Sequence, residues 1–390
     1  MTRARIRHIT SLAELRTHAA RWDDLWQRSD LTQPTYRAEL VAQWVEQFAS
    51  PAEIDALVVE DQGQWVAALA LLRRRMAGVA SVATLPSNPW AAAGELLWDC
   101  VGADQADAAR LLVETIGRED WQWLWLDGVT IDTPPWQALL AAAAHAGFAM
   151  VHRPQYQVGR VAIDHDWQHC SSRWSRKHRQ RMGAALRRLA ALGPVRLRLC
   201  ERLAQEEIEP WLRRAMVLED RGWKGAACTS VLRTPGMFAF FLRQARQLAL
   251  WNQLSIAFLE LNDRPIAFSY GLAAKGVFHS YKIGYDPDFA AYGPGQLLRY
   301  HLLEQFQDEH ERQAIDFLGP VSEAQLRWRP SLSTVGRLWI APKRLAGRMA
   351  LWAYEKLHGA AAYRPSAEAA MVGCESAQYC DRSTTEQSAR

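Results

Sequence analysis

Apolar residues recur along the chain with two different periods, and these periods predict where strands and helices lie. In the N-terminal part, strand-like and helix-like segments follow one another, and Gln62-Gly63 marks a hairpin turn. The predicted strands span 5–9, 55–60, 65–73, 96–99, 121–126 and 156–163, and the predicted helices span 12–28, 104–117 and 135–147. Strands with helices between them indicate an α/β layer architecture.

The segments after residue 165 repeat this order of elements. A predicted helix at 173–192 ends at Gly193, where a glycine C-cap belongs. Further helices are expected at 205–221, 235–250 and 296–310, and strands at 195–200, 254–261, 265–274, 277–285 and 314–318. We therefore predict an α/β (α+β) fold of two lobes, 1–165 and 166–345, each a mixed central sheet flanked by helices. A helix at 346–363 and a disordered tail at 364–390, rich in Ser, Ala, Gln and Thr, should follow.

The most informative stretch joins a predicted strand to a predicted helix through Gly293-Pro294-Gly295. The N–H groups of the first helical turn lack partners within the helix, and the helix dipole places positive potential there, so this end attracts phosphate. Glycine has no Cβ and lets a pyrophosphate approach the main chain. The pattern predicts a phosphorylated cofactor at this turn.

Several motifs, taken in their order along the chain, carry a family resemblance: 121–129 (WQWLWLDGV), 175–193, 218–225 (LEDRGWKG), 258–268, 293–295 and 315–319 (IDFLG). The glycine turn resembles motif A of the GNAT acyltransferases, Q/R-x-x-G-x-G/A, with Ala290 at its first position. Over about residues 10–345, the chain resembles the CelD-like GNAT branch associated with cellulose and exopolysaccharide biosynthesis. That branch is similar in build to the Fem-type aminoacyltransferases, so the resemblance implies two tandem GNAT-like lobes, with the acyl-CoA loop in the C-terminal one.

The resemblance implies direct transfer of an acyl group from acyl-CoA, acetyl or longer, to an amine or hydroxyl of an envelope or exopolysaccharide precursor. A main-chain N–H near a strand bulge, expected at 282–285, would stabilise the oxyanion. The predicted cofactor-binding residues are Tyr285, Tyr292, Gly293, Gly295 and Gln296.

Three residues are candidate catalytic groups. Tyr281 can protonate the departing thiolate, or it can pack in the wall of the cleft. Asp316 stands in an otherwise apolar strand, where it acts either as a base or orienting group or as a structural residue at an edge. Glu219 lies near the end of a predicted helix, within the LEDRGWKG motif.

Trp223, Lys224 and Asn88 are candidate substrate-binding residues. Trp223 and Lys224 suit an acceptor or acyl group, but they also suit ordinary packing and the negative pole of a helix C-terminus. Asn88 either lines a cleft or begins a turn before Pro89.

An arginine-rich segment at 173–188 is most simply a solvated helix face, although it could also contact cofactor phosphates, transfer RNA or an anionic membrane. The resembled branch carries a Tyr-Lys pair before Trp328, where this chain has Ala324-Gln325. Either Arg327 or Arg329 replaces that lysine, or the substrate has changed. The resemblance therefore leaves two alternatives, a Fem-like ligase that uses aminoacyl-tRNA and a non-catalytic scaffold of polysaccharide assembly.

Composition adds few constraints. Lys and Arg exceed Asp and Glu by four, and most of the 18 tryptophans are expected to fill cores. The six cysteines show no metal or redox spacing, so we expect no metal. The N-terminus lacks the apolar stretch of a signal peptide, and no apolar run approaches the roughly 20 residues of a membrane span. We expect a protein of the cytoplasm or of the inner face of the membrane, without stable membrane insertion; the oligomeric state stays open.

Overall fold

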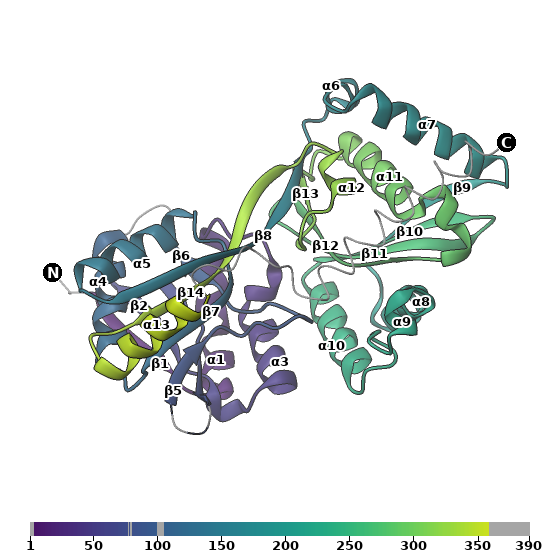
Figure 1. Cartoon of the computed structure of the whole chain (residues 1–390). Helices are drawn as coiled ribbons and strands as arrows, with labels where there is room; N and C mark the ends of the chain where they lie inside the picture. Colours follow the sequence, from purple (N-terminus) through teal and green to yellow (C-terminus); the bar gives the residue numbers. More distant parts are fainter. Residues whose placement is uncertain (1–3, 77, 79, 100–104, 359–390) are drawn as a thin grey trace. The chain divides into compact units, whose positions relative to one another are not determined.

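The computed structural model describes residues 4–358 except 77, 79 and 100–104. The described chain divides into two compact units (Figure 1). Unit 1 takes residues 4–31, 35–156 and 333–358, and unit 2 takes 32–34 and 157–332. The lobe boundary near residue 165 stays a prediction. The predicted tail at 364–390 lies outside the described residues, as do Cys100, Cys374 and Cys380.

Unit 1 contains two sheets with helices packed on them. One sheet has the order β1-β2-β3-β6, and in the other β4, β5, β7, β14 and β8 are neighbours. The strands are β1 (Arg5–Ile9), β2 (Ala56–Asp61), β3 (Gln64–Leu69), β4 (Leu72–Met76), β5 (Ala80–Thr84), β6 (Leu96–Trp98) and β7 (Trp123–Val129); β8 (Ala149–Ala162) and β14 (Ser331–Ala341) run through both units. The helices are α1 (Leu12–Thr17), α2 (Ala19–Arg28), α3 (Ala38–Phe48), α4 (Gln105–Arg118), α5 (Pro134–His145) and α13 (Leu345–His358), with short 3-10 turns at Pro34–Tyr36 and Pro51–Glu53.

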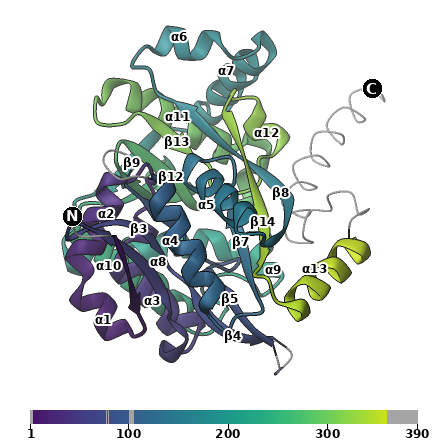
Figure 2. The same cartoon turned by 90° about the vertical axis from the view of Figure 1, so that its left-hand side faces the viewer.

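The core of unit 1 is rich in tryptophan. Trp98, Trp121 and Trp136 are buried together with aliphatic residues of the strands, and α4 and α5 pack side by side (Figure 2). The hairpin turn lies where the sequence predicts it, because Gln62 and Gly63 both adopt positive φ between β2 and β3. The helix predicted at 12–28 is two helices, since the chain leaves helical geometry at His18.

Unit 2 is built on one mixed sheet with the order β8-β13-β12-β11-β10-β9. Its strands are β9 (Val195–Glu201), β10 (Leu254–Leu261), β11 (Arg264–Ala274), β12 (Val277–Tyr285) and β13 (Ala314–Asp316). The helices are α6 (Trp167–Ser172), α7 (Arg176–Ala190), α8 (Gln205–Arg221), α9 (Trp223–Ala226), α10 (Met237–Leu250), α11 (Pro294–Asp308) and α12 (Glu323–Leu326), and η3 is a 3-10 turn (Pro287–Tyr292).

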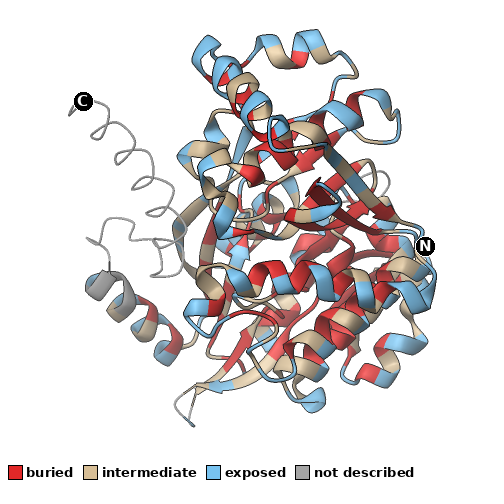
Figure 3. Cartoon of the chain, turned by 90° about the vertical axis from the view of Figure 1, so that its right-hand side faces the viewer, coloured by how far each residue is buried: buried red, intermediate tan, exposed pale blue. Residues whose placement is uncertain are grey.

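Helices cover both faces of the unit 2 sheet. Helices α7 and α11 lie over one face, and α8 and α10 over the other (Figure 1). Along these helices the buried positions lie on the side of the strands, while the exposed positions lie on the outer side (Figure 3). Mixed sheets flanked by helices confirm the predicted α/β fold class. In the described part of the chain, no helix is long and apolar enough to cross a membrane.

A buried carboxylate fixes the connection from β12 to α11. Asp286 follows β12 directly, has no exposed surface, and caps η3 by accepting a hydrogen bond from the N–H of Asp288. Its Oδ2 also accepts a hydrogen bond from Arg264 at 2.5 Å and forms an ion pair with Arg221 at 2.9 Å. Because Arg264 begins β11 and Arg221 ends α8, three elements meet at one carboxylate.

Replacing Asp286 with Asn should lower the free energy of unfolding by about 1–3 kcal/mol, because two charge-assisted contacts to a buried acceptor are lost. Asp288→Asn is the matched control: that carboxylate also contacts Arg221 but is mostly exposed, so its loss should cost about 1 kcal/mol at most. Urea unfolding followed by fluorescence measures both. Equal effects of the two variants would contradict the anchoring role.

A second prediction concerns Glu95 of unit 1, which is buried and accepts hydrogen bonds from Trp136 Nε1 and the N–H of Leu96. Burial raises the pKa of Glu95 to about 7. The native protein therefore keeps a proton that the unfolded chain loses above its ordinary pKa of 4.5, so stability falls as the pH rises from 4.5 to 7.

Glu95→Gln removes this dependence. The variant should be more stable than the wild type at pH 8, by at most about 3 kcal/mol, and the difference should shrink toward pH 4.5. Urea unfolding at the two pH values tests this, with the partly exposed Glu114→Gln as control. A stability difference that does not change with pH would refute it.

Candidate functional site

Strand β12 carries an irregularity at its centre. Gly271 of β11 pairs with Ser280, and Tyr270 pairs with Lys282, so Tyr281 has no partner residue in β11. An extra residue of this kind bends the strand and re-aims its main chain. The bulge lies immediately before 282–285, where the resemblance places the oxyanion donor, and that role stays a prediction.

The pairing between strands β12 and β13 ends before β12 does. Their parallel pairing covers only Val277–His279 against Ala314–Asp316, while β12 continues to Tyr285. Among the described strands, none pairs with the second half of β12 on this side. This edge can therefore pair with an extended ligand that carries amide groups.

The turn into α11 leaves room beside the main chain. Gly293 caps α11 in the left-handed conformation, φ 63° and ψ 50°, which favours glycine. A Cβ on Gly293 or Gly295 would meet no atom within 4 Å. The N–H groups of Gln296 and Leu297 bond to the Gly293 carbonyl, whereas Gly295 donates to no main-chain oxygen of the described residues. The open space and the helix N-terminus fit a phosphate group.

Gln296 ties this turn to the segment after β13. Its Oε1 accepts a hydrogen bond from Trp328 Nε1 at 2.8 Å, and Trp328 is buried. The side chain of Gln296 is thus engaged with the protein, and its role toward a cofactor stays a prediction.

The three tyrosines predicted around the turn occupy different environments. The hydroxyl of Tyr281 is buried, and burial raises its pKa well above its ordinary value. Its ring lies near Phe241 and Tyr270 on the face covered by α10. Tyr292 packs against the α7–α11 core, and Tyr285 is 45% exposed. The structure therefore does not bring all three together.

Asp316 supports a tight turn. Its Oδ1 accepts the N–H of Leu318, a residue with a positive φ of 57°. Its Oδ2 lies 3.8 Å from Nδ1 of His279, which is fully buried and opposite Asp316 across the β12–β13 pair. Burial lowers the pKa of His279 to about 4, so the ring is neutral at pH 7, although Asp316 opposes this effect. Sequence reasoning overlooked His279, and its only signal was a histidine in an apolar strand.

Glu219 is buried and its two oxygens are occupied. Oε1 accepts from Lys224 Nζ at 2.8 Å, and Oε2 accepts from the N–H of Val231 at 2.9 Å. The ammonium of Lys224 also lies 5.9 Å from the ring centroid of Trp223. These contacts stabilise the segment after α8. They favour the interpretation that the LEDRGWKG motif has a structural role. The catalytic role of Glu219 and the substrate roles of Trp223 and Lys224 stay predictions.

Asn88 belongs to unit 1, whereas the residues described above belong to unit 2. Its Oδ1 accepts the N–H groups of Trp90 and Ala91 at 2.9 and 3.0 Å. This arrangement is typical of a side chain that initiates a turn. It supports the turn interpretation of Asn88, and the substrate role stays a prediction.

The basic helix α7 packs beside the glycine turn. Arg188 donates to the Ala291 carbonyl at 3.4 Å, and its guanidinium lies 6.0 Å from the ring centroid of Tyr292. On α11, Arg299 is buried over Phe317, and burial lowers its pKa to about 10. Sequence reasoning missed Arg299 because it follows the helical pattern of an exposed residue. The described residues contain no cluster of three or more His, Cys, Asp or Glu able to hold a metal ion.

Comparisons with known proteins agree with the observed fold. Residues 176–325 match the acetyltransferase (GNAT) domain family. None of the curated proteins matches the chain. Among solved structures, FemX is similar with a TM-score of 0.58 and 11% identity, over 89% of this chain and 99% of FemX.

Two further structures resemble the chain. One is the C-terminal domain of a putative lysylphosphatidylglycerol synthetase from Agrobacterium fabrum, with a TM-score of 0.52 and 13% identity over 91% of this chain and 100% of that domain. The other is a conserved protein of unknown function from Bacteroides thetaiotaomicron, with a TM-score of 0.54 and 14% identity over 86% of this chain and 100% of that protein. Unit 2 therefore carries a GNAT acetyltransferase-fold domain.

Proposed function

We propose that unit 2 transfers an acyl group from an acyl-CoA, acetyl or longer, to an amine or hydroxyl group. The observation that carries this proposal is the turn between β12 and α11, where two glycines leave open space at a helix N-terminus. Gly295 supports it most, because no neighbouring atom and no positive φ requires a glycine there. Close approach of a ligand to the main chain would explain why this position is a glycine.

The chain's own groups suit such a donor. No described strand pairs with β12 beyond His279 on the β13 side, so amides of an extended thioester can pair there, and main-chain N–H groups at the Tyr281 bulge can stabilise a developing oxyanion. Coenzyme A supplies the thioester itself. A main-chain N–H that is already oriented toward the oxyanion stabilises the transition state by a few kcal/mol.

Two sets of side chains could move protons at this edge. The Tyr281 hydroxyl is buried and stays protonated, so it is the candidate proton donor to a leaving thiolate, and its raised pKa makes that transfer less favourable. His279 is neutral at pH 7 and lies next to the Asp316 carboxylate, which suits acceptance of a proton from the attacking group. We propose an envelope or exopolysaccharide precursor as the acceptor, and the cytoplasm or the inner membrane face as the location, on the resemblance of the motifs.

A second candidate is transfer of an aminoacyl group from transfer RNA. The fold similarity to FemX and the exposed arginines of α7, among them Arg176, Arg179, Arg187 and Arg188, favour it. Binding of transfer RNA to α7 would depend steeply on salt, because each neutralised phosphate releases counterions. Weak binding with a flat salt response would rule this candidate out.

Gly295→Leu tests the acyl-CoA site. The side chain enters open space in the first turn of α11, so the variant should fold with unchanged or slightly higher stability, by up to about 1 kcal/mol. Its bulk should abolish binding of acetyl-CoA and of a long-chain acyl-CoA, measured by calorimetry. Gly183→Ala on α7 is the control, since it also replaces a helical glycine but should leave binding unchanged.

Two results would contradict the proposal. Unchanged acyl-CoA affinity in Gly295→Leu would remove the turn from the cofactor site. Absence of binding to either thioester by the folded wild-type protein would favour the second candidate.

A further inference from the structure

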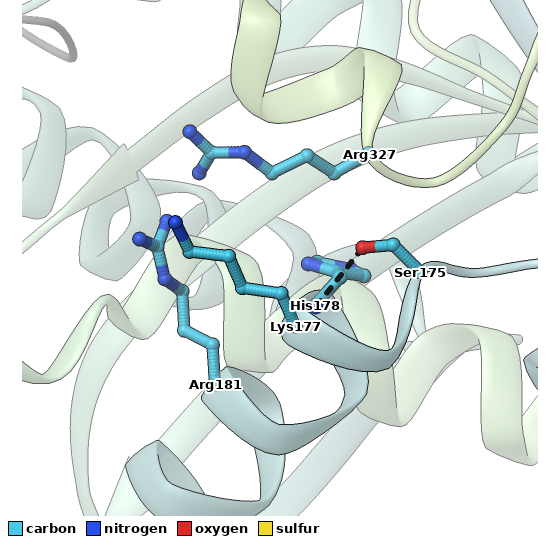
Figure 4. Close-up of a pocket in the computed structure, with 5 residues that line it drawn as sticks. All are labelled: Ser175, Lys177, His178, Arg181 and Arg327. Carbon is cyan, nitrogen blue, oxygen red and sulfur yellow. Dashed lines mark hydrogen bonds between the residues drawn. The ribbon is translucent and has the colours of Figure 1, made fainter.

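A cavity lies at the N-terminus of α7, and none of its lining residues belongs to the glycine turn of α11. It has a volume of about 140 Å³ and is lined by Ser175, Lys177, His178, Arg181 and Arg327. Four of these residues come from the start of α7, and Arg327 follows α12 (Figure 4). None of the five is acidic, so the cavity has a strongly positive lining.

The three cations of this cavity are not neutralised by the protein. Lys177, Arg181 and Arg327 form no ion pair within the described part of the chain, and their charged ends gather on one side of the cavity (Figure 4). Like charges at close range repel one another, and an anion between them reverses the sign of the interaction. Of the two arginines that could replace the missing lysine before Trp328, Arg327 is the one that lines this cavity.

His178 gives independent evidence for a ligand. Its side chain is only 4% exposed, and neither ring nitrogen has a hydrogen-bond partner in the protein. The rings of Trp174 and Trp328 lie edge-on against it at centroid distances of 5.7 and 4.6 Å. Burial, together with Arg327 and Arg181, lowers the pKa of His178 to about 4, so the ring is neutral and offers one N–H donor.

The helix itself adds to the positive potential. Ser175 caps α7, because its side chain accepts the N–H of His178. The cap accepts the N–H of His178, whereas the N–H groups of Arg176 and Lys177 lie before it in the first turn and have no partner within the helix. These two N–H groups are therefore available to a ligand at this end. Helix α7 has 15 residues, and its dipole favours negative charge at the same place.

We propose that this cavity binds the phosphate monoester group of a small-molecule ligand, at a site separate from the glycine turn. Three cations and a neutral donor match a dianion with several acceptor oxygens better than a single carboxylate. The volume exceeds that of several water molecules, at roughly 30 Å³ each, so it has room for a phosphate group. Ser175, Lys177 and Arg181 are exposed, which leaves a way out for the rest of the ester. This proposal does not depend on the acyltransferase function.

Calorimetric titration of the full chain with inorganic phosphate, in a buffer free of other dianions, tests the site. Arg327→Gln should weaken binding about tenfold or more, because a charge-assisted contact is lost. Arg176→Gln is the matched control, since it removes the same charge from the same helix turn but does not line the cavity, and it should bind as the wild type does.

His178→Phe separates binding from folding. An aromatic ring of similar shape between Trp174 and Trp328 should keep or raise the melting temperature, because it removes an unpartnered buried polar group. It should nevertheless weaken phosphate binding. Gly295→Leu should leave phosphate binding unchanged, so a failure of this proposal is distinct from a failure at the glycine turn.

Adenosine 3′,5′-bisphosphate and a hexose 1-phosphate identify the source of the phosphate group. The ligand whose affinity falls in Arg327→Gln but not in Arg176→Gln is the class that the cavity takes. The proposal is overturned if every probe binds Arg327→Gln and His178→Phe within about twofold of the wild type, or if Arg176→Gln weakens binding as much as Arg327→Gln does.

Discussion

The buried carboxylate of Asp286 is the contact on which the candidate site depends. It joins the start of β11, the end of α8 and the first residues of η3 through Arg264, Arg221 and the N–H of Asp288. Strand β12 ends one residue before it, and α11 begins a few residues after it. The direction in which the N-terminus of α11 points is therefore set by a carboxylate that is inaccessible to water. A charge in that position is stable only because both arginines reach it.

Elsewhere unit 2 leaves polar groups, among them buried side chains, without protein partners, and two of the places where this occurs bear on the proposed sites. The first turn of α11 and the cavity at α7 both present donors without a partner in the described part of the chain, among them the N–H of Gly295 and the ring of His178. Such groups cost stability, which the large apolar core between α7, α11 and the sheet offsets. At these two places a ligand can supply the missing partners.

Much of this architecture is readable in the sequence, and the exceptions have physical causes. The bounds of α8, β10 and β12 follow directly from residue periodicity. Strand β14 is missed because its pairing with β7 joins residues about 200 positions apart, and local pattern carries no such information. The bulge at Tyr281 is a property of register with β11, so the sequence of β12 alone cannot reveal it.

The candidate site residues also include some that local sequence rules predict and some that they do not. The glycine turn is predictable because helix termini and glycine have local rules, and the structure gives it the expected open space. For Glu219 the sequence shows the motif but not that Lys224 and a main-chain N–H already occupy its oxygens. His178 is hidden in a run of arginines, where only the tertiary packing of two tryptophans shows that it is buried.

Trp328 links the two surfaces of unit 2 that we propose to bind anions. Its indole N–H donates to Gln296 in the first turn of α11, while its ring lies edge-on against His178 at the α7 cavity. Arg327, its neighbour in sequence, lines the cavity. One buried side chain therefore forms part of the support of both surfaces and stands between their positive potentials. Because the indole offers one donor and one apolar ring, it satisfies the α11 side and leaves the ring nitrogens of His178 for a ligand.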